Sequence, residues 1–286
     1  MIAVFLLLIG CLSWQVHPPN RMGVPTVELP EGTVRVLEEG TGDAVMLLHG
    51  FAGSIDVWDG VRTELAKEHR VLTLEARGFG RSDRLPGDYS TGAMVTDIIG
   101  TMNARGVEHA TIIAHSWGSG AALALALAHP ERVDRLVLVD SLAYKGQVPW
   151  FLDAARTPFV GEALMGVFYT AHLDARLERG FYDPTLLEWK HVEGVRRLLS
   201  LPGSRPAALA VARGISLDTL SPRYRELKVP VLVVWGAQDR VTPPAWGERL
   251  VRDLPRGRLE RIDRCGHFPM LEAPERFLAL VGDFLP

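Results

Sequence analysis

The stretch Ala110-Thr-Ile-Ile-Ala-His-Ser-Trp-Gly-Ser-Gly120 joins an apolar run to a segment of small residues through a single serine, Ser116. The run from Ala110 to Ala114 favours a β-strand, and the alanines and leucines after Gly120 favour a helix that Pro130 ends. The stretch therefore predicts a strand, a tight turn and a helix, with Ser116 in the turn.

Such a tight turn requires small residues two positions before and after the serine, and Ala114 and Gly118 meet this requirement. The nucleophile motif G-x-S-x-G is changed here to A-x-S-x-G, which adds one methyl group and predicts a slightly different packing of the turn. Taken alone, the motif fits two roles for Ser116: a catalytic nucleophile, or a serine that caps the following helix.

Apolar runs recur along the chain with helical patterns between them. Continuous runs are typical of parallel strands that are covered on both faces, and they occur at residues 44–48, 71–74, 110–114, 136–139 and 231–235. Residues 33–39 alternate like a half-exposed strand, residues 259–262 are a weaker last strand, and the last helix is expected to begin at Pro274. The pattern predicts an α/β fold with a mostly parallel central sheet of about eight strands flanked by helices.

Between residues 142 and 224 the strand pattern disappears. We expect this segment to be a helical lid inserted into the domain, which leaves residues 26–141 and 225–286 as the two parts of the core. Its aromatic side chains would either line an apolar substrate pocket or pack the small core of the lid. They are Trp150, Phe151, Phe159, Phe168, Tyr169, Phe181, Tyr182 and Trp189.

Composition argues against several classes of function. The 286 residues carry 31 Lys and Arg against 34 Asp and Glu, a formal charge of −3 without the dense basic surface that nucleic acid requires. The two cysteines, Cys11 and Cys265, offer no disulfide framework, and no spacing typical of metal ligands occurs. We therefore predict a small-molecule substrate, no nucleic-acid partner, and neither a cofactor nor a metal.

Residues 1–22 form a separate N-terminal leader. Its first 16 residues have only Ser13 and Gln15 as polar side chains, and no basic residue precedes Arg21. The apolar run is shorter than the roughly 20 residues that span a bilayer, and it lacks the basic start of a secretory signal. We predict membrane association or export through residues 1–16; the alternatives are lipidation at Cys11, a buried first helix and a cytoplasmic protein.

Two other strand ends carry the partners that a serine nucleophile needs: a base that takes its proton and a carboxylate that orients the base. Asp239 follows the run 231–235, and His267 follows residues 259–262. Because functional groups in such sheets gather at the carboxyl ends of the strands, we predict a catalytic triad of Ser116, Asp239 and His267.

Each partner also has an alternative role. Asp239 would otherwise brace the turn before Pro243, and His267 would be a structural histidine beside the last helix. Asp140 closes the run 136–139 and competes with Asp239 for the role of the acid, although capping the first turn of the lid is its simpler explanation.

The residues after the run 44–48 are expected to complete the site. The loop that begins at His49 can turn its amides toward Ser116, so the backbone amides of Phe51 and Trp117 are the predicted oxyanion donors. We interpret His49 as a brace of this loop and His115 as part of the packing of the turn.

Taken together, these motifs resemble the α/β-hydrolase superfamily over residues 30–286. The resemblance rests on residues 49–51 (HGF), 77–83 (RGFGRSD), the turn at Ser116, and residues 234–239 (VWGAQD), 266–269 (GHFP) and 272–277 (EAPERF). As a set, these motifs are specific for the family and say little about the substrate. The resemblance is to the lidded branch, which includes esterases, carbon–carbon bond hydrolases, epoxide hydrolases, dehalogenases and cofactor-free haloperoxidases. Epoxide hydrolases and dehalogenases of this branch carry aspartate in place of Ser116.

The resemblance implies a serine hydrolase. We expect a carboxylic ester with an apolar acyl or alcohol part as the substrate, cleaved through an acyl-serine intermediate. Carbon–carbon bond hydrolysis and perhydrolysis use the same three residues and stay open as alternatives. A non-catalytic binding protein with this fold is the alternative of another class, and the complete set of triad residues argues against it.

Overall fold

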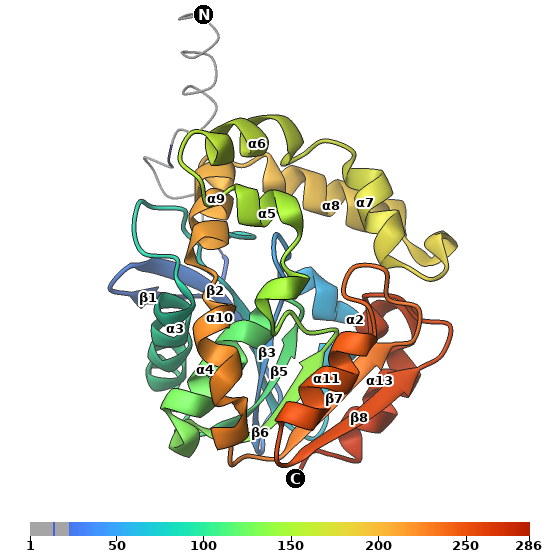
Figure 1. The fold of residues 1–286 in the computed structure, drawn as a ribbon. Helices are drawn as coiled ribbons and strands as arrows, with labels where there is room; N and C mark the ends of the chain where they lie inside the picture. The colour runs from blue at the N-terminus through green and yellow to red at the C-terminus, as the bar shows by residue number, and fades with distance from the viewer. Residues whose placement is uncertain (1–13, 15–22) are drawn as a thin grey trace, which may run out of the picture.

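An eight-stranded, mostly parallel β-sheet forms the centre of the molecule in a computed structural model that describes residues 14 and 23–286 (Figure 1). The strands lie in the order β1-β2-β4-β3-β5-β6-β7-β8; the pairs β1–β2 and β2–β4 are antiparallel, and the others are parallel. The bounds are β1 Thr26–Leu29, β2 Gly32–Glu39, β3 Ala44–Leu48, β4 Arg70–Glu75, β5 Ala110–His115, β6 Val133–Val139, β7 Val231–Gly236 and β8 Gly257–Ile262. The predicted fold class is confirmed, and the short strand β1 is one that the apolar pattern missed.

The central strands bury side chains on both faces of the sheet. In β6, Leu136 and Leu138 belong to one hydrophobic cluster, while Val137 and Val139 belong to the cluster on the opposite face. Successive side chains of a strand point to opposite faces, so a strand covered on both faces must be apolar at every position. This is the physical reason for the continuous apolar runs in the sequence.

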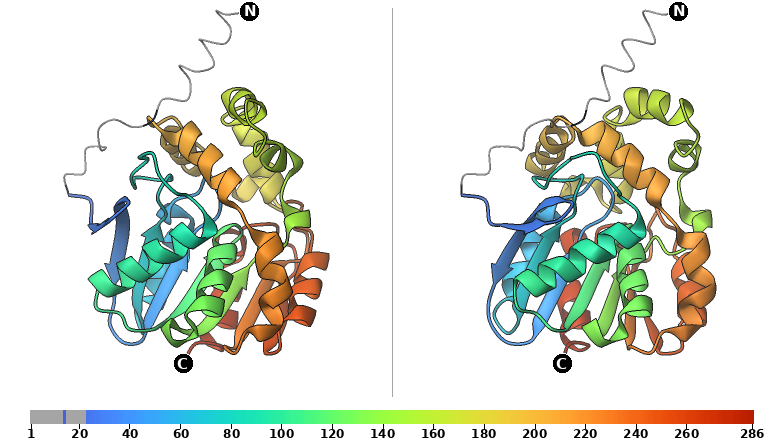
Figure 2. Two further views of the ribbon diagram at one scale, coloured as in Figure 1. Left: turned by 60° about the vertical axis from the view of Figure 1, so that its left-hand side comes forward. Right: turned by 90° about the vertical axis from the view of Figure 1, so that its left-hand side faces the viewer.

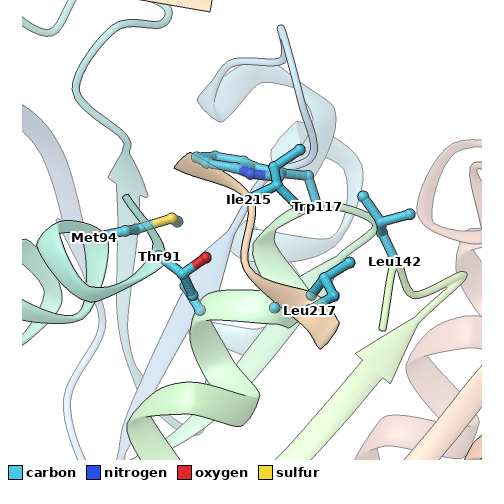
Figure 3. Close-up of a pocket in the computed structure, with 8 residues that line it drawn as sticks. Thr91, Met94, Trp117, Leu142, Ile215 and Leu217 are labelled. Carbon is cyan, nitrogen blue, oxygen red and sulfur yellow. The ribbon is translucent and has the colours of Figure 1, made fainter. Parts of the chain in front are cut away.

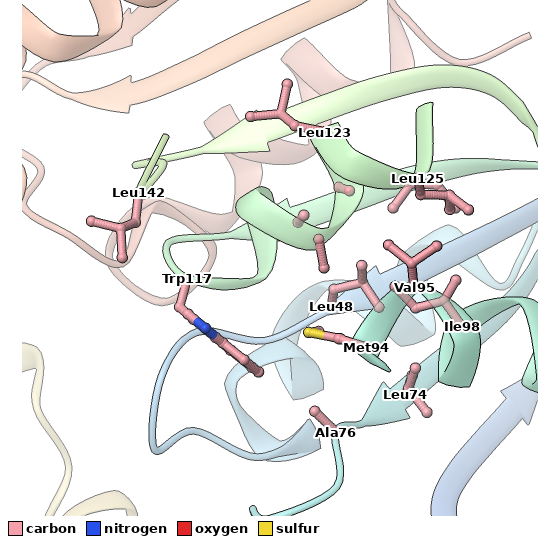
Figure 4. Packing of buried hydrophobic residues seen from close by; sticks show 14 of the residues in the cluster. Leu48, Leu74, Ala76, Met94, Val95, Ile98, Trp117, Leu123, Leu125 and Leu142 are labelled. Carbon is pink, nitrogen blue, oxygen red and sulfur yellow. The ribbon is translucent and has the colours of Figure 1, made fainter. Parts of the chain in front are cut away.

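Helices cover each face of the sheet (Figures 1 and 2). Residues of α3, α4 and α11 join the first cluster, part of which is drawn in Figure 4, and residues of α2, α12 and α13 join the second. The bounds are α2 Asp59–Leu65, α3 Thr91–Ala104, α4 Gly118–Ala128, α11 Ala245–Asp253, α12 Pro269–Glu272 and α13 Pro274–Gly282. The helices expected after Ser116 and from Pro274 are therefore present.

Between β6 and β7 the chain forms the helical lid, which lies over the carboxyl ends of the parallel strands (Figures 1 and 2). Its helices are α5 Trp150–Ala154, α6 Val160–Phe168, α7 Leu173–Gly180, α8 Trp189–Leu199, α9 Ser204–Gly214 and α10 Leu217–Leu220. The Tyr224 hydroxyl donates a hydrogen bond of 2.5 Å to the carbonyl of Ala143, which joins the two ends of the lid. The domain boundaries at residues 142 and 224 stay a prediction.

The predicted apolar leader, residues 1–16, lies outside the described residues except for Trp14, whose indole stacks on the ring of Tyr89. Within the described part of the chain, no helix has the length and apolar character needed to cross a membrane. Membrane association or export through the leader therefore stays a prediction.

A substitution at the end of β7 tests how closely the strand ends pack. A Cβ atom at Gly236 would overlap the carbonyl oxygen of Gly266, a backbone atom that cannot turn aside. We expect Gly236→Ala to lower the free energy of unfolding by about 3 kcal/mol, measured by urea denaturation. Gly282→Ala is the matched control, because nothing lies within 4 Å of a Cβ there, and it should be neutral or stabilising by up to about 1 kcal/mol.

If Gly236→Ala and Gly282→Ala unfold at the same urea concentration, the close approach of β7 to residues 265–266 is wrong.

Candidate active site

Ser116 occupies the turn between β5 and α4 with a left-handed backbone, φ +50°. Its amide donates to the carbonyl of Val139 at 2.9 Å, and its carbonyl accepts from Leu142 at 3.0 Å, so the end of β6 holds the turn in place. A Cβ atom at Gly118 would lie 2.7 Å from the carbonyl oxygen of His49, which explains the need for glycine there. Ala114 is fully buried in β5, so the turn forms with alanine at this position.

Four of the six non-glycine residues with positive φ in the described chain follow strands of the sheet at this edge. They are Ala52, Ser116, Asp140 and Arg264. Left-handed backbone costs a non-glycine residue about 1–3 kcal/mol and persists only where the surroundings impose it. Strain is thus concentrated where the sequence predicts the site.

The structure brings Ser116, His267 and Asp239 together at the carboxyl ends of β5, β8 and β7. His267 Nδ1 lies 2.8 Å from Asp239 Oδ2, and His267 Nε2 lies 3.0 Å from Ser116 Oγ. A carboxylate only accepts hydrogen bonds, so Nδ1 carries the proton and Nε2 accepts the proton of the serine hydroxyl. This is the geometry that general-base activation of a serine requires.

Asp239 is fixed by several donors. Its Oδ1 accepts the amides of Val241 at 2.7 Å and Thr242 at 3.0 Å, and its Oδ2 accepts the Thr242 hydroxyl at 2.7 Å. Burial alone would raise the pKa of Asp239, but the nearby charge and hydrogen bond of His267, together with these donors, hold it below its usual value. Asp239 is therefore a carboxylate aimed at His267.

Asp140, the competing candidate for the acid, lies next to this group without occupying the position of Asp239. Its Oδ1 accepts the amide of Gly236 at 2.9 Å, and its side chain is fully buried. Burial, followed by the charge of Asp239, raises the pKa of Asp140 well above its usual value. His267 Nδ1 donates its hydrogen bond to Asp239 and not to Asp140, which favours Asp239 as the orienting acid.

The loop after β3 approaches Ser116 closely. A Cβ atom at Gly50 would lie 3.1 Å from Ser116 Cβ, so the loop backbone runs directly beside the serine. Among the described residues, the amides of Phe51 and Trp117 donate no hydrogen bond, which leaves both amides available for an oxyanion. Their role as donors stays a prediction.

His49 braces this loop from inside. The amide of Ala76 donates to His49 Nε2 at 3.1 Å, so Nδ1 carries the proton and donates to the carbonyl of Gly50 at 2.7 Å. Burial lowers the pKa of His49 from 6.5 to about 4, so the ring stays neutral and this bond is kept. The interpretation of His49 as a loop brace agrees with these contacts.

His115 contacts His267 as well as the turn at Ser116. Its Nε2 donates to the backbone carbonyl of His267 at 2.8 Å, and the two rings lie 4.8 Å apart. Burial, followed by the neighbouring His267, lowers the pKa of His115 from 6.5 to about 3. Sequence reasoning expected packing at this position and missed the hydrogen bond, because residue 267 is 152 positions away.

The lid holds the loop that carries His267. The amide of His267 donates to the carbonyl of Gly180 at the end of α7, at 2.6 Å. Glu272 accepts the amide of Tyr182 at 2.7 Å and the amide of Gly266 at 2.9 Å, so one carboxylate joins the lid to the histidine loop. Glu272 belongs to the motif at residues 272–277, and the sequence alone assigned it no role.

A cavity of about 300 Å³ opens at Ser116 between the sheet and the lid. Its wall is mainly apolar, and it includes two of the predicted lid aromatics, Phe151 and Phe181. Trp150, Phe159 and Trp189 are instead 74%, 73% and 66% exposed. The aromatic residues predicted for the lid are therefore a mixture of pocket residues and surface residues. The side chains of Arg176, Lys190 and His191, also from the lid, add polar groups to the cavity wall.

Trp117 and Leu142 line both this cavity and a much smaller one of about 10 Å³, whose lining residues are drawn in Figure 3. The small cavity lies between Trp117, Met94, Ile215 and Leu217, and it has room for about one water molecule. Substrate-sized space therefore lies in the larger cavity, which contains Ser116.

The described residues that come nearest to a metal-binding arrangement are Asp140, Asp239 and His267, whose nearest donor atoms lie within 4.8 Å of one another. Asp239 and His267 are hydrogen-bonded to each other, and His267 is also bonded to Ser116. These hydrogen bonds engage two of the three side chains that a metal would need.

Comparison with known proteins shows similarity over most of the chain. The model of a family described as alpha/beta hydrolase fold matches residues 43–274. A 2-hydroxymuconate semialdehyde hydrolase of Pseudomonas sp. (strain CF600) is 32% identical over 263 residues, which are 87% of this chain and 88% of that protein.

Two solved structures are similar at 27% identity, and each similarity covers 91% of this chain and 96% of the other. One is a meta-cleavage product hydrolase of Pseudomonas fluorescens, with a TM-score of 0.78. The other is a thermophilic esterase of Thermogutta terrifontis, with a TM-score of 0.76.

The buried histidines make stability depend on pH. Because the pKa of His115 is about 3 in the folded protein and 6.5 is its ordinary value, protons bind the unfolded chain more readily, and stability falls as the pH drops from 6.5 toward 3. The variant His115→Gln keeps a donor for the His267 carbonyl. Between pH 6.5 and 5, we expect its free energy of unfolding to fall by about 2 kcal/mol less than that of the wild type.

Urea denaturation at several pH values measures this difference. His129→Gln, the same change at a histidine whose side chain is 43% exposed, should keep the pH dependence of the wild type. An unchanged slope in His115→Gln would contradict the neutral, buried state of His115.

Proposed function

The chain belongs to the α/β-hydrolase fold family, and from this premise we propose that it is a serine hydrolase in which Ser116, His267 and Asp239 are the catalytic residues. The observation that carries the proposal is the continuous line of hydrogen bonds from Ser116 Oγ to His267 and from His267 to Asp239, at 3.0 and 2.8 Å. The strained turn at Ser116, with φ +50°, supports the same role.

In the proposed reaction, Ser116 Oγ attacks the carbonyl carbon of the substrate while His267 Nε2 takes the hydroxyl proton. The imidazolium is stabilised by the Asp239 carboxylate, which itself stays ionised. The carbonyl oxygen becomes an oxyanion, and the amides of Phe51 and Trp117 donate to it; one such donor contributes about 3 kcal/mol. His267 then returns the proton to the leaving group, and the acyl-serine forms.

Water completes the cycle by the same steps in reverse order. His267 removes a proton from the water, the water oxygen attacks the acyl carbon, and Ser116 Oγ leaves with the proton. The chemistry requires only the residues at the site, so the proposal needs neither a cofactor nor a metal.

Carboxylic esters with an apolar acyl or alcohol part are the proposed substrates. The apolar wall of the cavity supports this class, because burying apolar surface contributes about 25 cal/mol per Å². The similarity to the esterase of Thermogutta terrifontis supports it as well. A volume of about 300 Å³ is within the usual range for a small-molecule site.

Carbon–carbon bond hydrolysis is the second candidate function. It is favoured by the similarity to the 2-hydroxymuconate semialdehyde hydrolase, at 32% identity over most of both chains. Parallel assays with aryl esters and with a 2-hydroxy-6-oxo-dienoate distinguish the two. A kcat/KM that is higher for the dienoate by about 100-fold or more would make this the main reaction.

A fluorophosphonate probe tests the nucleophile. We expect the wild type to be labelled and Ser116→Ala to lose both labelling and about 10⁶-fold in ester turnover, since the attacking oxygen is removed. Asp239→Asn should lower kcat by about 10⁴-fold, because an amide favours the wrong tautomer of His267.

Ser119→Ala is the matched control for this experiment. Ser119 is a buried serine in the first turn of α4, and its hydroxyl donates to the carbonyl of Ala114. Its replacement by alanine should leave labelling intact. Folded wild-type protein that takes up no label would instead support a non-catalytic binding protein.

Gly194 provides a test of the substrate pocket. It lies within α8, where glycine is unfavourable by about 1 kcal/mol relative to alanine, and it lines the cavity with nothing within 4 Å of a Cβ atom. We expect Gly194→Leu to lower kcat/KM for aryl octanoates by about 10-fold or more while aryl acetates change by less than about 3-fold.

The exposed Gly282→Leu is the control and should leave both substrates unaffected. If Gly194→Leu reduced the turnover of acetates and octanoates equally, the cavity below α8 would not be the site of the apolar chain.

A further inference from the structure

Two buried carboxyl groups, those of Asp140 and Asp239, lie close to each other and to His267. Asp140 and Asp239 are 0% and 4% exposed, and the nearest donor atoms of Asp140, Asp239 and His267 lie within 4.8 Å of one another. Asp239 is accounted for as the partner of His267, whereas the reaction proposed above gives Asp140 no role. The sheet nevertheless holds Asp140 in a strained conformation, with φ +43°, directly at the end of β6.

The two oxygens of the Asp140 carboxyl have different surroundings. Oδ1 accepts the amide of Gly236 at 2.9 Å, which is the normal contact of an acceptor. Oδ2 is buried and has no hydrogen-bond donor among the described residues. A buried anionic oxygen without a donor costs several kcal/mol, whereas a protonated oxygen at the same place is itself a donor.

The Asp239 carboxylate is the nearby acceptor for a protonated Asp140 Oδ2. Like charges at this separation in a buried site cannot both persist, so one carboxyl of the pair keeps a proton. Asp239 accepts from His267, Val241 and Thr242, all of which favour its charged form. Among the described residues, Asp140 has one amide donor and no cationic partner, so the proton belongs to Asp140.

We propose that Asp140 is a neutral carboxylic acid that donates a hydrogen bond from Oδ2 to the Asp239 carboxylate and thereby fixes its orientation toward His267. Asp140 is then a positioning residue that acts through Asp239. The Thr242 hydroxyl donates to Asp239 at 2.7 Å and lies 3.1 Å from the carbonyl of Asp140, so the end of β6 lies beside the same group. The inference rests on the proposed serine mechanism.

The other titratable groups around Asp140 do not offer it a positive charge. Glu272 is the carboxyl of the histidine loop that acts on Asp140, and its own pKa is raised, mainly by burial. Cys265 is buried in the same loop, and burial likewise raises the pKa of its thiol. His267 donates its Nδ1 proton to Asp239 at 2.8 Å. The surroundings therefore reinforce the neutral form of Asp140.

The state of Asp140 decides what Asp140→Asn does. Asparagine has the same shape, accepts from the Gly236 amide through its oxygen and donates to Asp239 through its nitrogen. If Asp140 is neutral, Asp140→Asn keeps kcat/KM within about 3-fold and leaves the acid limb of the pH profile in place. If Asp140 is ionised, the same change removes a negative charge near the imidazolium, and the acid limb moves to lower pH.

Asp140→Ala removes both hydrogen bonds and supplies the contrast. We expect kcat/KM to fall by about 10- to 100-fold with KM little changed, because Asp239 loses its fixed orientation. The acid limb should move to higher pH, since an Asp239 carboxylate with one donor fewer stabilises the imidazolium more strongly. Rescue by asparagine, but not by alanine, separates positioning from simple space filling.

Infrared difference spectra between the wild type and Asp140→Asn test protonation without using activity. A neutral carboxyl has a carbonyl stretching band that carboxylates lack, and this band should be present at neutral pH in the wild type and absent in the variant. Absence of the band in the wild type would overturn the inference, as would a loss in Asp140→Asn equal to that in Asp140→Ala.

These outcomes are distinguishable from a failure of the serine mechanism. If Ser116→Ala retained wild-type turnover, the proposed function would fail while the infrared band still reported Asp140. If Ser116→Ala were inactive and the band were missing, only the inference on Asp140 would fail. Urea denaturation of each variant confirms that the protein compared is folded.

Discussion

The arrangement of the site depends on the turn at the end of β5. Ser116 can hold its left-handed backbone because the neighbouring strand end accepts its amide and supplies a donor to its carbonyl, through Val139 and Leu142. The same turn brings Gly118 against the carbonyl of His49, so the loop with the expected oxyanion donors must lie beside the serine. One strained residue thus fixes three strand ends relative to one another, and packing of the sheet offsets its cost of about 1–3 kcal/mol.

Around this turn, groups that are far apart in the chain hold His267 from several directions. His115 holds the carbonyl of His267, the lid carbonyl of Gly180 holds its amide, and Asp239 holds its ring. Glu272 adds a bond from the histidine loop to the lid. The lid therefore supports the loop that carries His267 as well as covering the cavity. Direct contacts link the position of the lid to the geometry of His267.

Much of the fold could be read from the residues because it depends on local patterns. The strands β3 to β7 were visible as continuous apolar runs, since coverage on both faces removes every polar position. The short edge strand β1 has no such pattern, and four residues offer too little periodicity to identify it. In the lid, aromatic residues indicated a pocket, yet Trp150 and Trp189 are exposed, because hydrophobicity does not reveal which side of a helix faces the cavity.

The sequence by itself determined the order of the strands along the chain, the turn at Ser116 and the candidates Asp239 and His267, because each follows from a local motif at a strand end. Only the tertiary structure decided how these residues meet. Asp140 and Asp239 carry the same side chain at two strand ends, and the sequence offered both as the orienting acid. The register of β6 beside β7 directs one toward His267 and the other toward the amide of Gly236, and such a difference in direction depends on contacts between distant residues.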